Sequence, residues 1–224
     1  MFEDRKGAGQ KLGRALKEYK GKGAVVLAIP KGGVEVGYEV AKYLEAEFLI
    51  AIARKLPFPD DPEAGFGAIA EDGSSFIFES AAQSVSRRDI ERIQEEQRSE
   101  IERRIKVLRN GRPLPGLKGR VVIAVDDGLA MGSTMRTVIM LCRKAQAQKV
   151  IVAIPVAGAD VADAIGELAD ELVVLETPAY FRAVAQVYRN WYDVSDEEVI
   201  GILARWRSRR PEKLPRRQKG TVEI

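Results

Sequence analysis

Short apolar runs alternate with segments of helical periodicity along most of the chain. The runs at 24–29, 121–125 and 150–156 are continuously apolar, which is typical of strands buried on both faces of a parallel sheet. Between such runs, apolar residues recur every three or four positions, the period of an amphipathic helix. This alternation predicts an α/β fold in which a mostly parallel, twisted sheet carries helices on both faces, with right-handed crossovers.

The boundaries of the expected elements follow from these runs and from capping signals. Asp4, Ser86 and Ser195 each stand where an N-cap residue precedes a helix, and Ser86 and Ser195 open segments that resemble a capping box. We expect strands at 24–29, 48–53, 76–78, 121–125, 150–156 and 172–175, and helices at 4–19, 36–44, 86–109, 134–147, 160–169 and 195–208.

The chain is expected to form one α/β domain over residues 1–208. Between Leu56 and Gly73 it has three prolines and three glycines among acidic residues, which predicts a long loop, about 55–75, of the kind that serves as a lid. A charged helical segment is expected as an insertion at about 84–110. Residues 209–224 form a basic tail, for which a flexible, solvated terminus is favoured over a nucleic-acid-binding arm.

Composition narrows the classes of function. The 224 residues include 36 basic and 33 acidic side chains, a net charge of +3, so the whole molecule is not a polycation that coats nucleic acid. The chain has no histidine, and Cys142 is its only cysteine, which excludes an internal disulfide, the usual zinc sites and histidine-based triads. No apolar run could cross a bilayer and the start does not resemble a secretory signal, so a cytoplasmic protein is expected, with no membrane partner.

The chemistry concentrates between residues 121 and 137. Asp126 and Asp127 directly follow an apolar strand, and ligands of open parallel sheets bind beyond the carboxyl ends of the strands. Two adjacent carboxylates can accept hydrogen bonds from neighbouring sugar hydroxyls or attract a cation. The loop 128–134 combines two glycines with Ser133 and Thr134, which lets backbone N–H groups approach a phosphate at a helix N-terminus.

Other nucleotide-binding motifs do not fit this segment. A P-loop requires a lysine after its second glycine, where this chain has Ser133, and the Rossmann pattern of three glycines is absent. An ordinary strand-to-helix turn explains the glycines but not two acids followed by an anion-binding loop.

The segment resembles the ribose-phosphate signature of type I phosphoribosyltransferases, in which two acids after an apolar strand precede Gly-x-Ala-x-Gly-x-Thr. Residues 29–34 are similar to the pyrophosphate loop of that family, and residues 54–68 lie where the family has a mobile lid. The overall arrangement, including 180–193, is most similar to a poorly characterised bacterial branch whose phosphoribosyltransferase label is itself an inference.

The resemblance implies that the ligand is 5-phosphoribosyl-1-pyrophosphate with Mg²⁺. The ion would be held mainly by the donor's own oxygens, so Asp126 and Asp127 would contact the metal at most indirectly. These two acids, with Lys31, would be the catalytic residues, acting on the ribose hydroxyls and on pyrophosphate. Taken alone, the Lys31 segment could be a common turn, and Arg54 and Lys55 could be merely solvated. Further substrate-binding residues would be Gly32, Gly33, Arg54, Lys55, Gly128, Ala130, Met131, Gly132, Ser133 and Thr134.

The expected activity is transfer of the phosphoribosyl group to a nitrogenous acceptor with release of pyrophosphate. Ala130 stands where 6-oxopurine enzymes of the family have an acid, so the acceptor stays unassigned. The acceptor would be covered by a hood formed either by the charged helix at 86–109 or by an aromatic segment with Tyr180, Phe181, Tyr188, Trp191 and Tyr192.

Two other functions stay open at this stage. One is a non-catalytic regulator that binds the same donor and contacts nucleic acid or protein through 205–219 or the charged helix. The other is a nucleotidase or kinase-like protein that uses Asp126 as a nucleophile or metal ligand. A homo-oligomer, most simply a homodimer, is expected in either case.

Overall fold

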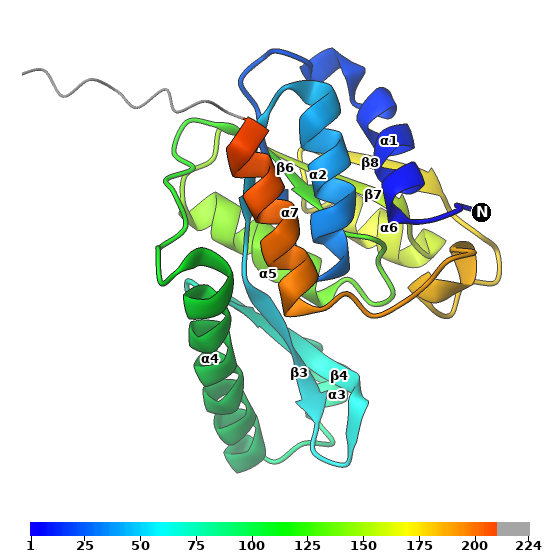
Figure 1. Cartoon of the computed structure of the whole chain (residues 1–224). Helices are drawn as coiled ribbons and strands as arrows, with labels where there is room; N and C mark the ends of the chain where they lie inside the picture. The colour runs from blue at the N-terminus through cyan, green and yellow to red at the C-terminus, as the bar shows by residue number, and fades with distance from the viewer. Residues whose placement is uncertain (210–224) are drawn as a thin grey trace, which may run out of the picture.

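The central sheet has five parallel strands in the order β2-β1-β6-β7-β8, as seen in a computed structural model that describes residues 1–209 (Figure 1). Every neighbouring pair in this sheet is parallel. The predicted α/β fold is confirmed. The strands are β1 (Val25–Ala28), β2 (Glu47–Ile50), β6 (Val121–Val125), β7 (Lys149–Val156) and β8 (Glu171–Glu176).

Helices cover both faces of this sheet because alternate residues of each strand point to opposite sides. In β1, Val26 and Ala28 join the core under α1 and α2, while Val25 and Leu27 join the core under α5 and α6. Helix α7 packs beside α2 on the first side (Figure 1). The helices are α1 (Arg5–Ala15), α2 (Gly32–Leu44), α5 (Ser133–Lys144), α6 (Ala159–Gly166) and α7 (Asp196–Arg209), with the 3-10 turns η1 (Lys17–Tyr19) and η2 (Val184–Val187).

The capping signals in the sequence are confirmed. The Asp4 side chain accepts the N–H of Gly7 at 2.6 Å, which fixes the start of α1. Ser195 and Glu198 form a reciprocal box, because each side chain accepts the backbone N–H of the other residue, at 3.2 and 2.8 Å.

A small lobe projects from the central body (Figure 1). It consists of an antiparallel sheet in the order β3-β4-β5 and the long helix α4, which begins after the predicted N-cap Ser86. The apolar stripe of α4 faces the lobe, with Ile93, Ile101 and Leu108 buried. The elements of the lobe are β3 (Ala53–Phe58), β4 (Asp61–Ala70), β5 (Ser75–Ile77), α3 (Glu79–Ala82) and α4 (Arg87–Arg109).

The predicted loop between Leu56 and Gly73 is wrong, because most of this segment forms the β3–β4 hairpin. Its prolines and glycines serve the strands instead of breaking them. The pairing register shifts on either side of Pro57, as at a β-bulge. A Cβ on Gly67 would lie 2.2 Å from the carbonyl oxygen of Phe76, so the close approach of β4 and β5 requires glycine.

The predicted strand at 48–53 is also too long. The Ala51 N–H still donates to Ala28, but Ile52 turns away and exchanges hydrogen bonds with Glu71, whose side chain accepts the Ile52 N–H at 2.9 Å. The apolar run continues because Ile52 and Ala53 are buried at the start of the lobe. A continuous run therefore spans two strands of different sheets.

The predicted basic tail, 209–224, lies outside the described residues except for Arg209, the last residue of α7. Within the part of the chain that the structure describes, no helix has the length and apolar character needed to cross a membrane.

Candidate functional site

The loops that follow β1 and β6 meet at the carboxyl edge of the central sheet. The chain runs from β1 outward to β2 and later returns on the other side of β1 as β6, so β1 and β6 flank the point where the strand order reverses. The Ile29 N–H donates to the carbonyl of Val125 at 2.9 Å, which holds the two loops together at their start. In open α/β sheets this switch point is the usual place for a ligand.

Two glycines allow the loop after β1 to lie against the acids after β6. A Cβ on Gly32 would lie 1.9 Å from Asp127 Oδ2, and a Cβ on Gly33 would lie 2.8 Å from Asp126 Cα. Neither space is available to a side chain. The start of α2 is therefore in direct contact with both carboxylate residues.

Asp126 and Asp127 are partly buried, and their environment works against ionisation of both. The Asp127 side chain is 14% exposed, which leaves it open to a ligand. Burial raises the pKa of Asp126 well above its usual range, and the charge of Asp127 adds to the effect. Burial also raises the pKa of Asp127, against an opposing effect of Arg5. The pair thus favours a shared proton until hydroxyl or cationic partners arrive.

The loop after the acids leads into the N-terminus of α5. Gly132, the N-cap, has φ +74°, a left-handed conformation that suits glycine, and no side chain caps the helix. Ser133 and Thr134 are partly exposed at its first turn. Uncapped N–H groups with the positive end of the helix dipole form an anion-binding site.

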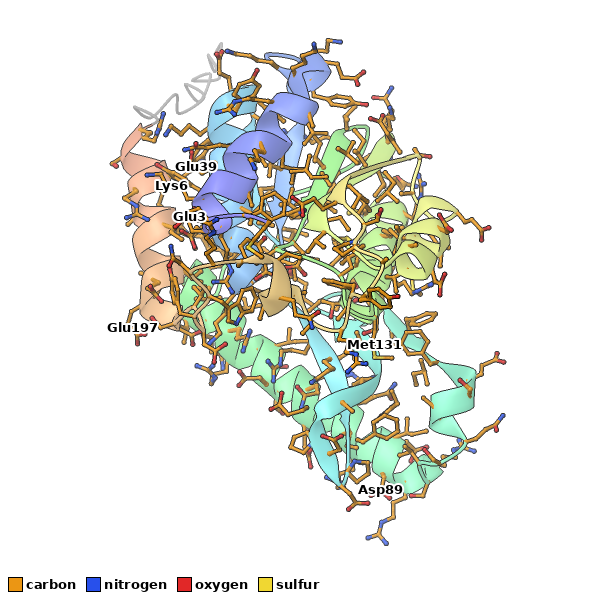
Figure 2. All side chains as sticks on the ribbon, turned by 90° about the vertical axis from the view of Figure 1, so that its right-hand side faces the viewer. Glu3, Lys6, Glu39, Asp89, Met131 and Glu197 are labelled. Atoms are coloured by element: carbon orange, nitrogen blue, oxygen red, sulfur yellow. The ribbon has the colours of Figure 1, made fainter. Side chains whose placement is uncertain are left out.

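A cavity of about 250 Å³ lies between this loop and the small lobe. Its walls include Asp126 and residues 128–135 from the body, and Lys55, Glu63 and Gly65 from the β3–β4 hairpin. Figure 2 shows Met131 at the junction of the body and the lobe, whereas Asp89 lies at the far end of the lobe. The hairpin, which is the segment that the sequence predicts to be a lid, thus forms one wall of this cavity.

Arg5 is a site residue that the sequence analysis missed. Its Nε donates to Asp127 Oδ2 at 2.8 Å, and its side chain is only 3% exposed. The guanidinium stacks on Trp191, 4.0 Å from the ring centroid. One signal was present in the sequence: Arg5 has helical spacing with Ala8 and Leu12, so it is a cation on the buried face of the first helix.

The other predicted residues divide into those near the acids and those away from them. Lys55 lines the cavity, but Arg54, its neighbour in β3, points to α4 and donates to Gln97 Oε1 at 3.1 Å. Lys31 is partly exposed ahead of α2, where its charge acts on Glu197 of α7. The strand predicted at 48–53 would place Arg54 and Lys55 at the carboxyl end of the central sheet, but both lie within β3, which belongs to the lobe.

The aromatic segment lies over the acids, whereas α4 packs on the lobe. Tyr188 donates its hydroxyl to the Asp127 carbonyl at 2.7 Å, and Trp191 contacts Arg5. Val184 of η2 covers Gly128, where an added Cβ would lie 2.7 Å from the valine side chain. Tyr180 is 94% exposed. Of the two predicted sources of a hood, only the aromatic segment contacts the acid-bearing loop directly.

The sequence of the chain is similar to that of known phosphoribosyl transferase proteins. Residues 5–189 match the family described as phosphoribosyl transferase domain. Two curated proteins of Mycobacterium tuberculosis, from strains CDC 1551 / Oshkosh and ATCC 25618 / H37Rv, are each 39% identical over 207 residues, or 92% of this chain, and are provisionally named phosphoribosyl transferases. The chain spans about half, 47%, of the length of these relatives.

A solved structure has the same fold. The crystal structure of TT1426 from Thermus thermophilus is 35% identical, covers 92% of this chain and 98% of its own, and superposes with a TM-score of 0.76. With the family match over most of the chain, these similarities establish its membership. The chain belongs to the phosphoribosyl transferase domain family.

Proposed function

We propose that the chain binds 5-phosphoribosyl-1-pyrophosphate and transfers its phosphoribosyl group to a nitrogenous acceptor, with release of pyrophosphate. One observation carries the proposal. A pair of carboxylates at the switch point of the sheet is followed, within a single loop, by an uncapped helix N-terminus that lines a cavity. A sugar phosphate has the matching groups, since its hydroxyls donate hydrogen bonds and its phosphate accepts them.

In this proposal each group of the donor has a partner in the chain. Oxygens of Asp126 and Asp127 accept the ribose hydroxyls, and N–H groups of 130–134 donate to the 5′-phosphate. Lys31 and the loop before α2 contact pyrophosphate, and Lys55 approaches from the hairpin. Gly32 and Gly33 support this role because they bring backbone, with no side chain, against the acids.

The reaction then needs little besides positioning and charge. The bond between C1′ and the pyrophosphate oxygen breaks, and its electron pair leaves with pyrophosphate. Positive charge develops on the ribose ring, where the carboxylates stabilise it. The acceptor nitrogen attacks C1′ with its lone pair and afterwards loses its proton to solvent or to the departing group. Burial of the site under the hairpin limits the competing attack of water.

The oxygen atoms of the site suit a Mg²⁺ ion that arrives bound to the substrate. Within residues 1–209, no three Asp, Glu, Cys or His side chains gather closely enough to hold a metal ion by themselves. Two carboxylates next to donor oxygens leave most ligands of the ion to the pyrophosphate and hydroxyl groups, which is how Mg²⁺ is commonly bound. When bound, the ion would supply neutralisation of the leaving group.

Pyrophosphate release tests the transferase directly. The full chain is incubated with donor and Mg²⁺ and with a panel of purine, pyrimidine and other nitrogenous acceptors, and pyrophosphate is measured over a control without acceptor. We expect release that depends on one class of acceptor. Donor binding without release over the whole panel would favour a regulator, and release of phosphate from nucleotides without donor binding would favour a nucleotidase.

A further inference from the structure

The side chain of Arg5 is deeply buried, although an arginine can begin a helix with its side chain in solvent. It is the first residue of α1, yet its side chain is 3% exposed and both of its hydrogen bonds go to distant parts of the chain. Nε donates to Asp127 Oδ2 at 2.8 Å, and Nη1 donates to the carbonyl of Tyr192 at 2.9 Å. A buried guanidinium is costly unless it is paired, so this geometry is determined by its partners.

Aromatic rings fix the plane of the guanidinium. Trp191 lies 4.0 Å from it, Tyr192 5.5 Å and Tyr188 6.0 Å, measured to the ring centroids. Stacking of this kind restricts rotation of the planar group and favours Arg over Lys. Tyr188 also donates its hydroxyl to the carbonyl of Asp127 at 2.7 Å, so one aromatic segment orients both Arg5 and the backbone of its carboxylate partner.

The N-terminal segment is tied to the aromatic segment by backbone hydrogen bonds. The Phe2 N–H donates to Val187 at 2.7 Å, and the Arg189 N–H donates to Phe2 at 3.0 Å. These backbone hydrogen bonds alone fix the position of residue 5 relative to the aromatic segment. The N-terminal segment and the aromatic segment are distant in sequence, yet both contact Asp127.

The carboxylates of Asp126 and Asp127 have different hydrogen-bond partners. Arg5 donates to Oδ2 of Asp127, so Oδ1 is the oxygen through which Asp127 would accept a hydroxyl of a ligand. Asp126 instead uses its Oδ1 to accept the Asp127 N–H at 2.8 Å. Tyr188 and Glu35 are further titratable groups close to this cluster, and Arg5 is the cation that acts on all of them.

We propose that Arg5 is a positioning residue that clamps Asp127, so that its free oxygen reads one hydroxyl of the donor's ribose while Asp126 reads the other. This role rests on the proposed function, because it assumes that the acids hold a phosphoribosyl group. It adds a specificity: recognition of one particular hydroxyl depends on an arginine from the N-terminal helix.

The test compares three phosphosugars: ribose 5-phosphate, 2-deoxyribose 5-phosphate and 3-deoxyribose 5-phosphate. Their affinities are measured by calorimetry for the full wild-type chain and for Arg5→Gln, Arg5→Lys and Arg14→Gln. Arg14 is a matched control, because it lies exposed on the same helix. A hydrogen bond from a hydroxyl to a carboxylate is worth roughly tenfold or more in affinity, so the wild type should prefer ribose 5-phosphate over each deoxy sugar by about that factor.

In Arg5→Gln, the preference for one of the two hydroxyls should fall to about twofold while the other persists, because only Asp127 loses its clamp. Arg5→Lys keeps a cation beside Asp127 and should retain part of the preference, which also covers the case in which the glutamine variant fails to fold. Arg14→Gln should match the wild type. An Arg5→Lys or Arg5→Gln protein that keeps both preferences in full overturns this role and leaves the proposed function intact. A wild type that binds none of the phosphosugars and no donor overturns both.

Discussion

Substitution of Gly33 by alanine tests the contact between α2 and the acids with a single methyl group. The added Cβ would lie 2.8 Å from Asp126 Cα and 3.0 Å from the carbonyl oxygen of Val125. Ordinary van der Waals contact begins at 3.4 Å, so the backbone of β6 or of α2 must move by about 0.6 Å. These two atoms are backbone, so a rotamer change of the third neighbour, Asp126 Oδ1 at 2.8 Å, does not relieve the overlap.

Two effects of opposite sign decide the stability of Gly33→Ala. Alanine in a helix is favoured over glycine by up to about 1 kcal/mol. Overpacking of a closely packed contact costs about 1–3 kcal/mol, so we expect a net loss of about 1–2 kcal/mol in the free energy of unfolding. A misplacement of about 1 Å can cost about 100-fold in the rate of a catalysed reaction, and we expect the smaller displacement here to lower donor affinity by about tenfold.

Gly201→Ala is the matched control, since Gly201 lies in α7 and an added Cβ there meets no atom within 4 Å. This variant should gain up to about 1 kcal/mol in the free energy of unfolding, and its donor affinity should be unchanged. Urea unfolding gives the stabilities, and calorimetric titration with donor and Mg²⁺ gives the affinities. A Gly33→Ala protein that is as stable as wild type and binds the donor equally well would show that the contact between α2 and the acids is not closely packed.

Three further substitutions test single side chains in and beside the site. Burial raises the pKa of Asp126 in the folded protein above its unfolded value of about 3.9, so this carboxyl's contribution to wild-type stability is fully present below that pH and is lost as pH rises toward the folded pKa. Asp126→Asn should therefore gain stability relative to wild type as pH rises from about 4 into the neutral range. Urea unfolding over this range checks it, and a difference that does not change with pH would count against the assignment. Lys55→Ala should weaken donor binding about tenfold, since Lys55 lines the cavity, whereas Arg54→Ala should leave affinity within about twofold and lower stability by about 1 kcal/mol through loss of its bond to Gln97. Equal losses of affinity in both variants, by calorimetry, would contradict this division.

The parts of the fold that the sequence predicts correctly are those set by local pattern. The strand at 121–125, the acids and the start of α5 are contiguous, so an apolar run, two carboxylates and the glycine at 132 are sufficient to predict them. The N-cap at Ser86 and the capping box at Ser195 are equally local. Burial of β1 on both faces follows from its unbroken apolar run.

The errors arise where a residue serves a distant partner. Gly67 and Pro57 indicate a loop when only the chain is considered, but they accommodate β5 and a bulge in the hairpin. The end of β2 depends on Glu71, whose side chain captures Ile52 and turns the chain into the lobe. Propensity carries no information about such pairings, because tertiary contacts override it.

Arg5 shows the same limit for the site. Its partner Asp127 lies 122 positions away, and the ring that stacks on it is farther still along the chain. Helical spacing places Arg5 on the buried face of α1, which signals a buried cation without naming its partner. The acids and the loop 128–134 could therefore be recognised from the sequence, whereas the contact of Arg5 with Asp127 could not.

The most direct test of the central claim is calorimetric binding of 5-phosphoribosyl-1-pyrophosphate with Mg²⁺ to the full chain and to Asp126→Asn/Asp127→Asn. Circular dichroism establishes that the double variant is folded, and Gly201→Ala serves as the control. We expect binding by the wild type and the control and a loss of roughly tenfold or more in the double variant, because the ribose hydroxyls lose charged acceptors. Unchanged affinity in the folded double variant would contradict it.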